Sequence, residues 1–385
     1  MTPKPAAKPA RPWFSAGPTA KRPGWALANL PTNLMGRGIR APEVVERFAH
    51  GLRLTREVLG PPDDHVMLYT PGSDTGAVEA ALWCMLGERP VQVVAYENFG
   101  LTWLADVKEH LGLEPEALTA PWGELPDLSR VDPKKDVVFP WNGTTSGVRV
   151  PNGDWIADDR EGLTICDATS AAFAMDLPWD KLDVVTYSWQ KVLGGEGAHG
   201  VLVLSPRAVA RLESHTPAWP MPKLFRMTKG GKLIAGIFEG ETINTPSMLV
   251  VEDALDGLKW SESIGGLPAL MGRCRANLSA IEKWVAGCDA VAFLAARPEI
   301  RSCTSVCLRI VAPWFARLDA EGQQKAQKAI VALLEKEGVA YDLGAYRDAP
   351  AGLRIWAGAT VETSDIEALL PWIEWALAEA AKDFA

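Results

Sequence analysis

Short apolar runs separated by helical segments constrain the fold of this 385-residue chain more than any other feature of its sequence. The runs cover residues 65–70, 91–95, 137–140, 163–166, 184–187 and 201–204. Apolar residues at helical spacing cover 44–59, 77–86 and 101–111. Short buried strands that alternate with helices are typical of a doubly wound, mostly parallel sheet. The sequence therefore predicts an α/β fold whose large domain is built on such a sheet.

The pattern changes after residue 260. Helical spacing covers 267–286, 323–337 and 364–381, and apolar strands cover 306–311 and 353–356. The cluster Thr363-Ser364-Asp365 is suited to the start of the last helix. These elements predict a smaller C-terminal α/β domain at 261–385, after a large domain at 13–260. Residues 1–12 are rich in Pro, Ala and Lys, lack an amphipathic face and predict a mobile N-terminal arm.

Composition and charge exclude several classes of protein. Hydrophobic residues make up 48% of the chain and charged residues 23%, as in globular proteins rather than disordered ones. The net charge of −9 disfavours a nucleic-acid partner, because binding phosphates requires a basic surface. No apolar run approaches the ~20 residues of a membrane span. The six cysteines form no C-x-x-C pair, so we expect free thiols, no metal site and a cytoplasmic protein without a membrane partner.

A phosphate-binding turn is predicted at residues 72–76. The strand at 65–70 runs into Gly72-Ser73-Asp74-Thr75-Gly76, and a helix follows. At such a turn the main-chain N–H groups at the helix start face outward and bind anions. We expect the N–H groups of Asp74 and Thr75 to hold a phosphate, with Gln190 as a further side-chain donor.

An acid and a lysine follow two of the predicted strands. Asp167 comes directly after the run 163–166, and Lys191 follows the run 184–187. Residues just beyond the carboxyl ends of parallel strands gather in one crevice. An acid and a lysine beside a phosphate-binding turn suit pyridoxal phosphate. Lys191 would form a Schiff base with the cofactor aldehyde and move the substrate proton, Asp167 would keep the pyridine nitrogen protonated, and Trp103 would stack on the ring.

Each of these residues has a simpler interpretation when taken alone. Asp167 fits a helix cap or a turn, Lys191 a surface charge, Trp103 a core residue and Gly72–Gly76 an ordinary turn. Their order and spacing together favour the cofactor site. The stretch 195–200 matches the dinucleotide pattern G-x-G-x-x-G, but a strand follows it where that pattern requires a helix. We therefore interpret it as a loop beside the lysine.

Six motifs resemble those of the phosphoserine aminotransferases, class V aminotransferases of pyridoxal-phosphate fold type I. They are PGSDTGAVEAALW (71–83), VFPWNGTTSGVRVPNGDWI (138–156), CDATSA (166–171), YSWQKVLGGEGAHG (187–200), INTPSM (243–248) and YRDAPAGLRIW (346–356). The resemblance runs from about residue 13 to the C-terminus. It implies exchange of an amino group between phosphoserine/3-phosphohydroxypyruvate and glutamate/2-oxoglutarate in serine biosynthesis, and leaves open a part in pyridoxine biosynthesis.

The resemblance also implies a role for each matching residue. Lys191 matches the lysine that carries the cofactor, Asp167 the partner of the ring nitrogen, Trp103 the stacking aromatic and Thr144 a hydroxyl near the ring oxygen. The implied phosphate contacts are Asp74, Thr75 and Gln190, joined by Asn244 and Thr245 from the neighbouring subunit of a homodimer. The implied substrate contacts are Arg354 for the α-carboxylate and Arg40 and Arg347 for the distal anion.

Two positions depart from the usual family pattern. Ile39 stands before Arg40 where a histidine is usual, and Thr75 stands where an arginine is usual. Both usual residues help to bind the distal anion, so selectivity for the distal group is in question here. Lys229 or Lys232 are candidates to compensate.

Two other functions stay open at this point. One is a different class V activity, such as a small amino acid–glyoxylate aminotransferase. Glyoxylate requires no distal cations, so Arg40 and Arg347 favour the phosphoserine reaction. The other is a non-catalytic binding module on the same fold, which the presence of Lys191, Asp167 and Trp103 disfavours.

Overall fold

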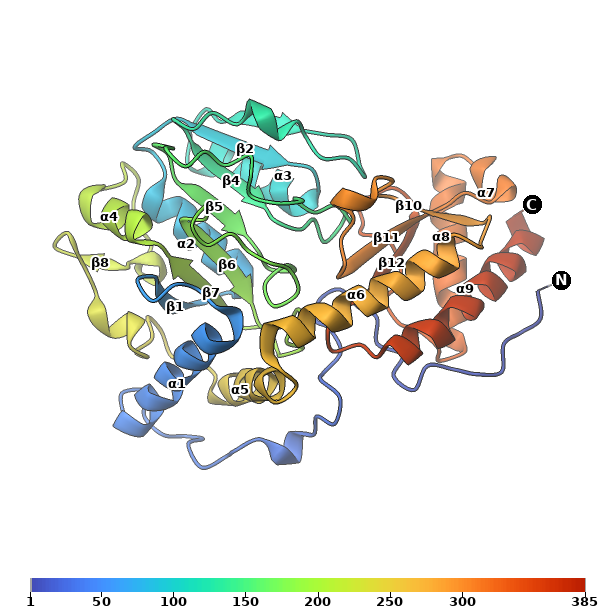
Figure 1. Ribbon diagram of the computed structural model, residues 1–385, viewed down its shortest axis with the longest axis horizontal. Coiled ribbons are helices and arrows are strands. Elements are labelled where there is room, and N and C mark those ends of the chain that lie inside the picture. The colour runs from blue at the N-terminus through green and yellow to red at the C-terminus, as the bar shows by residue number, and fades with distance from the viewer. Residues whose placement is uncertain (1, 385) are drawn as a thin grey trace.

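The computed structural model describes residues 2–384 and contains a large and a smaller β-sheet, each flanked by helices (Figure 1). The strands are β1 (Val66–Pro71), β2 (Val91–Ala95), β3 (Glu116–Thr119), β4 (Asp136–Pro140), β5 (Thr164–Asp167), β6 (Val184–Ser188), β7 (His199–Leu204), β8 (Thr228–Lys229), β9 (Lys232–Leu233), β10 (Val291–Phe293), β11 (Ser305–Ile310) and β12 (Gly352–Trp356). The α-helices are α1 (Pro42–Leu59), α2 (Ser73–Met85), α3 (Asn98–Ala105), α4 (Pro206–Ser214), α5 (Met248–Ser263), α6 (Gly266–Val285), α7 (Pro313–Ala316), α8 (Ala320–Lys336) and α9 (Thr363–Phe384).

The large sheet has seven strands in the order β1-β7-β6-β5-β4-β2-β3. All neighbouring pairs are parallel except those of β7, which is antiparallel to both β1 and β6. This confirms the predicted doubly wound, mostly parallel sheet. The predicted strands were recognisable because strands buried on both faces read as continuous apolar runs.

The two faces of this sheet pack against different sets of helices. Met67 and Tyr69 of β1 belong to one hydrophobic cluster, together with residues of α1, α5 and α6. Leu68, between them, belongs to a second cluster with residues of α2, α3 and α4. Side chains alternate between the faces of a strand, so one apolar run supplies both clusters.

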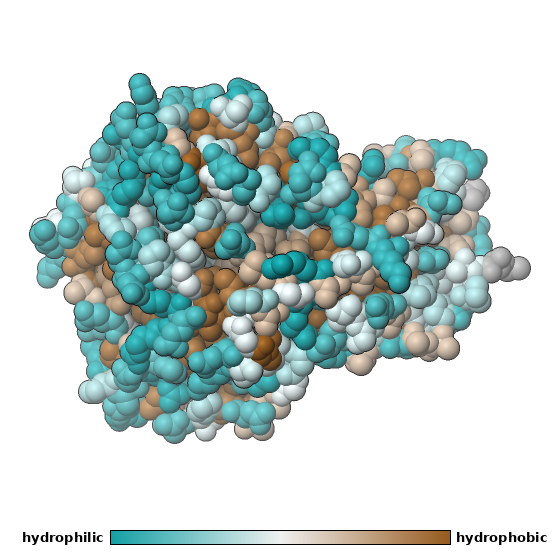
Figure 2. All heavy atoms as spheres, viewed as in Figure 1, coloured by the Kyte–Doolittle hydropathy of each residue, from teal (hydrophilic) through white to brown (hydrophobic). Residues whose placement is uncertain are grey.

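The smaller sheet is antiparallel, in the order β10-β11-β12. Helices α8 and α9 pack beside it, and α6 runs from the large sheet towards it (Figure 1). The domain boundaries expected at residues 12 and 260 stay predictions. No helix within residues 2–384 is both long and apolar enough to cross a membrane. Hydrophilic side chains predominate on the face shown in Figure 2, with scattered hydrophobic patches.

The N-terminal segment differs from the expected mobile arm. Its main chain packs on α9, where Trp372 Nε1 donates to the Ala7 carbonyl at 2.7 Å and the Ala10 N–H donates to Asp365 at 2.7 Å. The Lys4 ammonium lies 5.3 Å from the Trp375 ring and 2.7 Å from Glu337. These contacts come from residues more than 300 positions away, and local composition carries no trace of them. Asp365, expected to cap α9, binds this segment.

Candidate active site

The carboxyl ends of three adjacent strands bring the candidate residues together. Pro140 at the end of β4 pairs with Asp167 at the end of β5, and Asp167 pairs with Thr186 in β6. One cavity opens at this edge. It is lined by Ser73, Asp74, Thr75, Glu97, Phe99, Trp103, Asn142, Thr144, Asp167, Thr169, Gln190 and Lys191. Seven residues predicted from the sequence therefore line a single cavity.

Asp167 is held in place by two donors. Trp103 Nε1, on α3, donates to one carboxylate oxygen at 3.0 Å, and the Thr169 N–H donates to the other at 3.0 Å. Both Asp167 and Trp103 are buried. These two donors fix the orientation of the Asp167 carboxylate in the cavity. A carboxylate that pairs with a ring nitrogen requires such a fixed orientation.

Lys191 lies in the turn after β6 and is also buried. Burial and the Arg354 cation lower the pKa of Lys191 to about 8, against the opposing effect of Asp167 and Asp74. At this pKa a sizeable fraction of the side chain is a neutral amine near neutral pH, which a nucleophile or general base needs.

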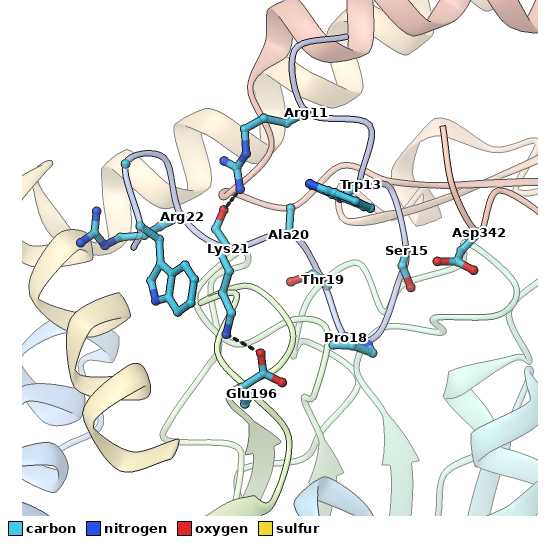
Figure 3. A pocket seen from close by; sticks show the side chains of 12 residues that line it. Arg11, Trp13, Ser15, Pro18, Thr19, Ala20, Lys21, Arg22, Glu196 and Asp342 are labelled. Atoms are coloured by element: carbon cyan, nitrogen blue, oxygen red, sulfur yellow. Dashed lines mark hydrogen bonds and ion pairs between the residues drawn. The ribbon is translucent and has the colours of Figure 1, made fainter. Parts of the chain in front are cut away.

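The N-terminal segment passes directly over Lys191. The Lys191 ammonium donates to the Ala16 carbonyl, and Thr19 Oγ1 donates to the Lys191 carbonyl at 2.6 Å. A side chain on Gly17 would place its Cβ 2.4 Å from Lys191 Nζ, so any larger residue here would displace the end of the Lys191 side chain. Farther along the same segment, the Lys21 ammonium forms an ion pair with the Glu196 carboxylate at 2.8 Å (Figure 3).

The phosphate-binding turn has the predicted form. Gly72, with φ +87°, precedes α2, and the N–H groups of Gly72 and Ser73 both donate to the Ala198 carbonyl. The next N–H groups, of Asp74 and Thr75, belong to the first helical turn and have no partner inside the helix. A Cβ on Gly76 would lie 1.9 Å from the Pro71 carbonyl oxygen. Ala198, within the glycine-rich loop 194–200, thus orients the turn rather than binding a dinucleotide.

Arg354, on β12 of the smaller sheet, is half-buried and does not line the cavity. Its charge nevertheless contributes to the lowered pKa of Lys191, and its guanidinium lies 5.6 Å from the Tyr346 ring. The Nε atom is shielded from solvent and has no hydrogen-bond partner within residues 2–384. A buried polar atom without a partner is costly and is typical of a place where a ligand binds.

Besides Arg354, four further predicted residues do not line this cavity within one chain. Asn244 and Thr245 lie in a surface loop before α5, where Asn244 Nδ2 donates to the Thr245 carbonyl. Arg40 is exposed and 4.0 Å from Glu241, and Arg347 is exposed and 3.4 Å from Asp348. Lys229 and Lys232, the candidates to compensate for Ile39 and Thr75, are exposed on the β8–β9 hairpin.

Glu97 is a residue of the site that the sequence analysis missed. It directly follows β2 and the buried Tyr96, so the rule that identified Asp167 also applied to it. Its carboxylate accepts from the Gly100 N–H at 2.8 Å and from Thr145 Oγ1 at 2.7 Å. Burial raises the pKa of Glu97 to about 7. Glu97 thereby joins the start of α3, which carries Trp103, to the loop that carries Thr144.

Several buried polar atoms of the site have no partner within residues 2–384, among them Asp74 Oδ1, Asn142 Oδ1, Gln190 Oε1 and Arg354 Nε. Unpaired buried polar groups are costly and mark a place where a polar ligand binds. Together with the unpaired N–H groups of α2, a fixed carboxylate and a lysine of lowered pKa, they fit pyridoxal phosphate.

No family model matches the chain. It is 55% identical to the phosphoserine aminotransferase of Methanosarcina mazei over 374 residues, 97% of this chain and 98% of that protein. Among solved structures, pyridoxal-phosphate-bound phosphoserine aminotransferase from Trichomonas vaginalis aligns with a TM-score of 0.72 and 15% identity, over 94% of this chain and 99% of that one. Alanine–glyoxylate aminotransferase from Nostoc sp. aligns with a TM-score of 0.78 and 18% identity, over 98% of each chain.

The two structural similarities show the fold alone and do not separate the phosphoserine from the glyoxylate enzymes. The similarity to the Methanosarcina mazei protein extends over the whole chain and does separate them. It confirms the resemblance seen in the six motifs. The chain therefore belongs to the phosphoserine aminotransferases, pyridoxal-phosphate-dependent enzymes of the class V aminotransferase fold.

Proposed function

We propose that this protein interconverts O-phospho-L-serine plus 2-oxoglutarate and 3-phosphohydroxypyruvate plus L-glutamate in serine biosynthesis. The observation that carries the proposal is the cavity where Lys191, Asp167 and Trp103 meet, in a chain 55% identical to a phosphoserine aminotransferase. The unpaired Arg354 in the same site supports it, because both amino donors carry an α-carboxylate.

Each residue of the site then has a defined task. Pyridoxal phosphate, when bound, supplies an electron sink for the bond that breaks at the substrate α-carbon. Lys191 would hold the cofactor and would serve as the base that takes the substrate α-proton and returns it. Asp167 would pair with the ring nitrogen, and Trp103 would cover the ring.

The remaining residues would bind and orient. The N–H groups of Asp74 and Thr75 would hold the phosphate, with Gln190 as a further donor, and the Thr144 hydroxyl would contact the ring oxygen. Arg354 would bind the substrate α-carboxylate, because its planar guanidinium suits a bidentate pair.

We further propose a homodimer in which each subunit completes the site of its partner. Thr245 and Arg40 are exposed in the single chain, and Asn244 is half-buried. Leu249, in the first turn of α5 just after this loop, is an exposed large hydrophobic residue. A partner subunit would cover Leu249 and bring Asn244 and Thr245 to the phosphate and Arg40 to the distal anion. The free thiols of all six cysteines support a reducing, cytoplasmic location.

Separate half-reactions with phosphoserine, glutamate, serine and alanine test the function. The purified protein with bound cofactor should convert phosphoserine and glutamate to their oxo acids far faster than serine or alanine. Alanine as the fastest donor would favour the glyoxylate-type enzyme instead. Lys191→Arg keeps the charge but removes the attachment, so it should abolish turnover while circular dichroism shows the fold retained. Turnover by Lys191→Arg near the wild-type rate would overturn the assignment.

A further inference from the structure

A second carboxyl, that of Asp74, lies inside the cofactor cavity. The phosphate-binding role of this residue uses only its main-chain N–H, which leaves its side chain without an assigned task. Asp74 is 6% exposed and lines the cavity beside Thr75 and Asp167. Its Oδ1 atom is shielded from solvent and has no hydrogen-bond partner within residues 2–384.

Asp74 and Asp167 line the same cavity and are both buried, but they have different surroundings. Asp167 accepts hydrogen bonds on both oxygens, from Trp103 and from the Thr169 N–H. Asp74 receives no donor on Oδ1. When two buried carboxyls share one site, the charge of one disfavours the ionisation of the other. Of the two, Asp74 lacks on Oδ1 the donors that would stabilise a carboxylate.

We propose that Asp74 is a protonated, neutral acid that donates a hydrogen bond to the Asp167 carboxylate and thereby positions it against the cofactor ring nitrogen. Asp74 is thus a positioning residue that acts through Asp167. This inference rests on the proposed function for its consequence, because only a bound cofactor presents that nitrogen. The protonation of Asp74 itself is a property of the protein without cofactor.

The charges around Asp74 support this assignment. Burial, and then the charge of Asp167, raise the pKa of Asp74 well above its ordinary value. The hydroxyls of Thr169 and Thr186 would favour the carboxylate, yet neither has a hydrogen-bond partner. The start of α2 and the Lys191 ammonium also favour the carboxylate. Burial and the charge of Asp167 outweigh both effects in the protein without cofactor. A bound phosphate dianion would favour the protonated acid further, because it adds negative charge beside Asp74.

Infrared spectroscopy of the cofactor-free protein tests the protonation directly. At about pH 8.5, above the pKa of Glu97, the wild type should show the C=O stretch of a protonated buried carboxyl. Asp74→Asn should lack this band, and the control Glu97→Gln should retain it. Absence of the band from the wild type, or its survival in Asp74→Asn, would overturn the proposal. Neither result depends on which substrate the enzyme uses.

Cofactor release tests the positioning role. Asp74→Asn keeps a neutral donor of the same shape, so the dissociation constant for pyridoxal phosphate should stay within about threefold of the wild type. Asp74→Ala removes the donor and should weaken cofactor binding roughly tenfold, since charge-assisted hydrogen bonds are the stronger kind. Circular dichroism of both variants checks the fold. An Asp74→Asn variant as impaired as Asp74→Ala would show that Asp74 acts as a carboxylate and would overturn the proposal.

Discussion

The proposed recognition of the distal anion involves two exposed arginines, Arg40 and Arg347. Because Ile39 and Thr75 stand where the family usually has cations, we expect these arginines to carry the pairing with the phosphate or the γ-carboxylate. Hydrogen bonds to charged groups contribute about 1.5–3 kcal/mol each. Arg347→Ala and Arg40→Ala should therefore each lower kcat/KM for phosphoserine by roughly one to two decades. Alanine has no distal anion, so its low rate should barely change.

The comparison of the two donors makes this prediction specific. Arg317→Ala, which removes another exposed arginine outside the cavity, is the matched control and should leave both rates unchanged. Equal proportional losses for phosphoserine and alanine in Arg347→Ala would mean that this residue supports the fold or the cofactor instead. The distal anion would then bind to other residues.

One positional rule brought predicted residues to the same place in the fold. Asp167 and Lys191 were singled out because they follow strongly apolar strands and carry groups that one cofactor needs, and both line the cavity. Their roles stay predictions. Glu97 satisfied the same positional rule but was missed. The chemistry of the cofactor assigns a task to one side-chain acid, Asp167, and none to a further acid. Its importance comes from the contacts with Gly100 and Thr145, which only the folded chain reveals.

Glu97 binds the N-terminal end of helix α3 through the Gly100 N–H. The free energy of unfolding should therefore depend on the ionisation of Glu97, and so on pH. The folded pKa of about 7 exceeds the ordinary value of 4.5, so the folded state binds more protons between these limits. Stability contributed by protonated Glu97 is complete below about pH 4.5 and is lost as pH rises through 7. Relative to Glu97→Gln, the wild-type free energy of unfolding should fall by roughly 3 kcal/mol across this window. Urea titrations at a series of pH values measure it.

The exposed Asp127, at the start of another helix, provides a control for the pH dependence expected of Glu97. Asp127 caps a short 3₁₀ helix (Leu128–Arg130), and its hydrogen bonds with Ser129 lower its pKa. Its contribution must therefore decline as pH falls, opposite in sign to that of Glu97. A wild-type minus Glu97→Gln difference that is flat from pH 4.5 to 7 would mean that water reaches the Glu97 carboxylate.

Elements were predictable from sequence in proportion to their burial. The six strands predicted in the large domain, β1, β2, β4, β5, β6 and β7, are almost wholly buried and therefore mostly apolar. The edge strand β3 has one buried residue in four and carries no such signal. Helix α4 was missed because it places Arg211 in the interior, where Asp136 pairs with it at 2.8 Å. Tertiary contacts, rather than local pattern, stabilise these elements.

At the scale of the whole molecule, one chain holds most of the site but not all of it. The cavity contains seven of the residues proposed to bind the cofactor, and Arg354 of the smaller sheet lies outside its lining. Asn244, Thr245 and Arg40 also lie outside the cavity, and the last two are exposed. Only the family resemblance assigned these three residues to the site. The pattern of apolar residues did not predict it, and the fold of a single chain does not bring them to the cavity. The proposed homodimer accounts for this separation, and a symmetric pair would form two such sites.

Mixing two inactive variants tests this arrangement. Lys191→Ala removes the attachment point, and Thr245→Ala removes the phosphate contact given to the partner. A heterodimer of the two has one site with both residues intact, made of Lys191 from one subunit and Thr245 from the other. With random pairing, about half of the dimers are mixed, so co-refolding should yield roughly a quarter of wild-type activity. If Thr245 served its own subunit, every site in the heterodimer would lack one residue, and activity would not exceed the sum of the separate variants. Lys191→Ala mixed with the double variant Lys191→Ala/Thr245→Ala is the negative control, because no pairing of these chains restores a site.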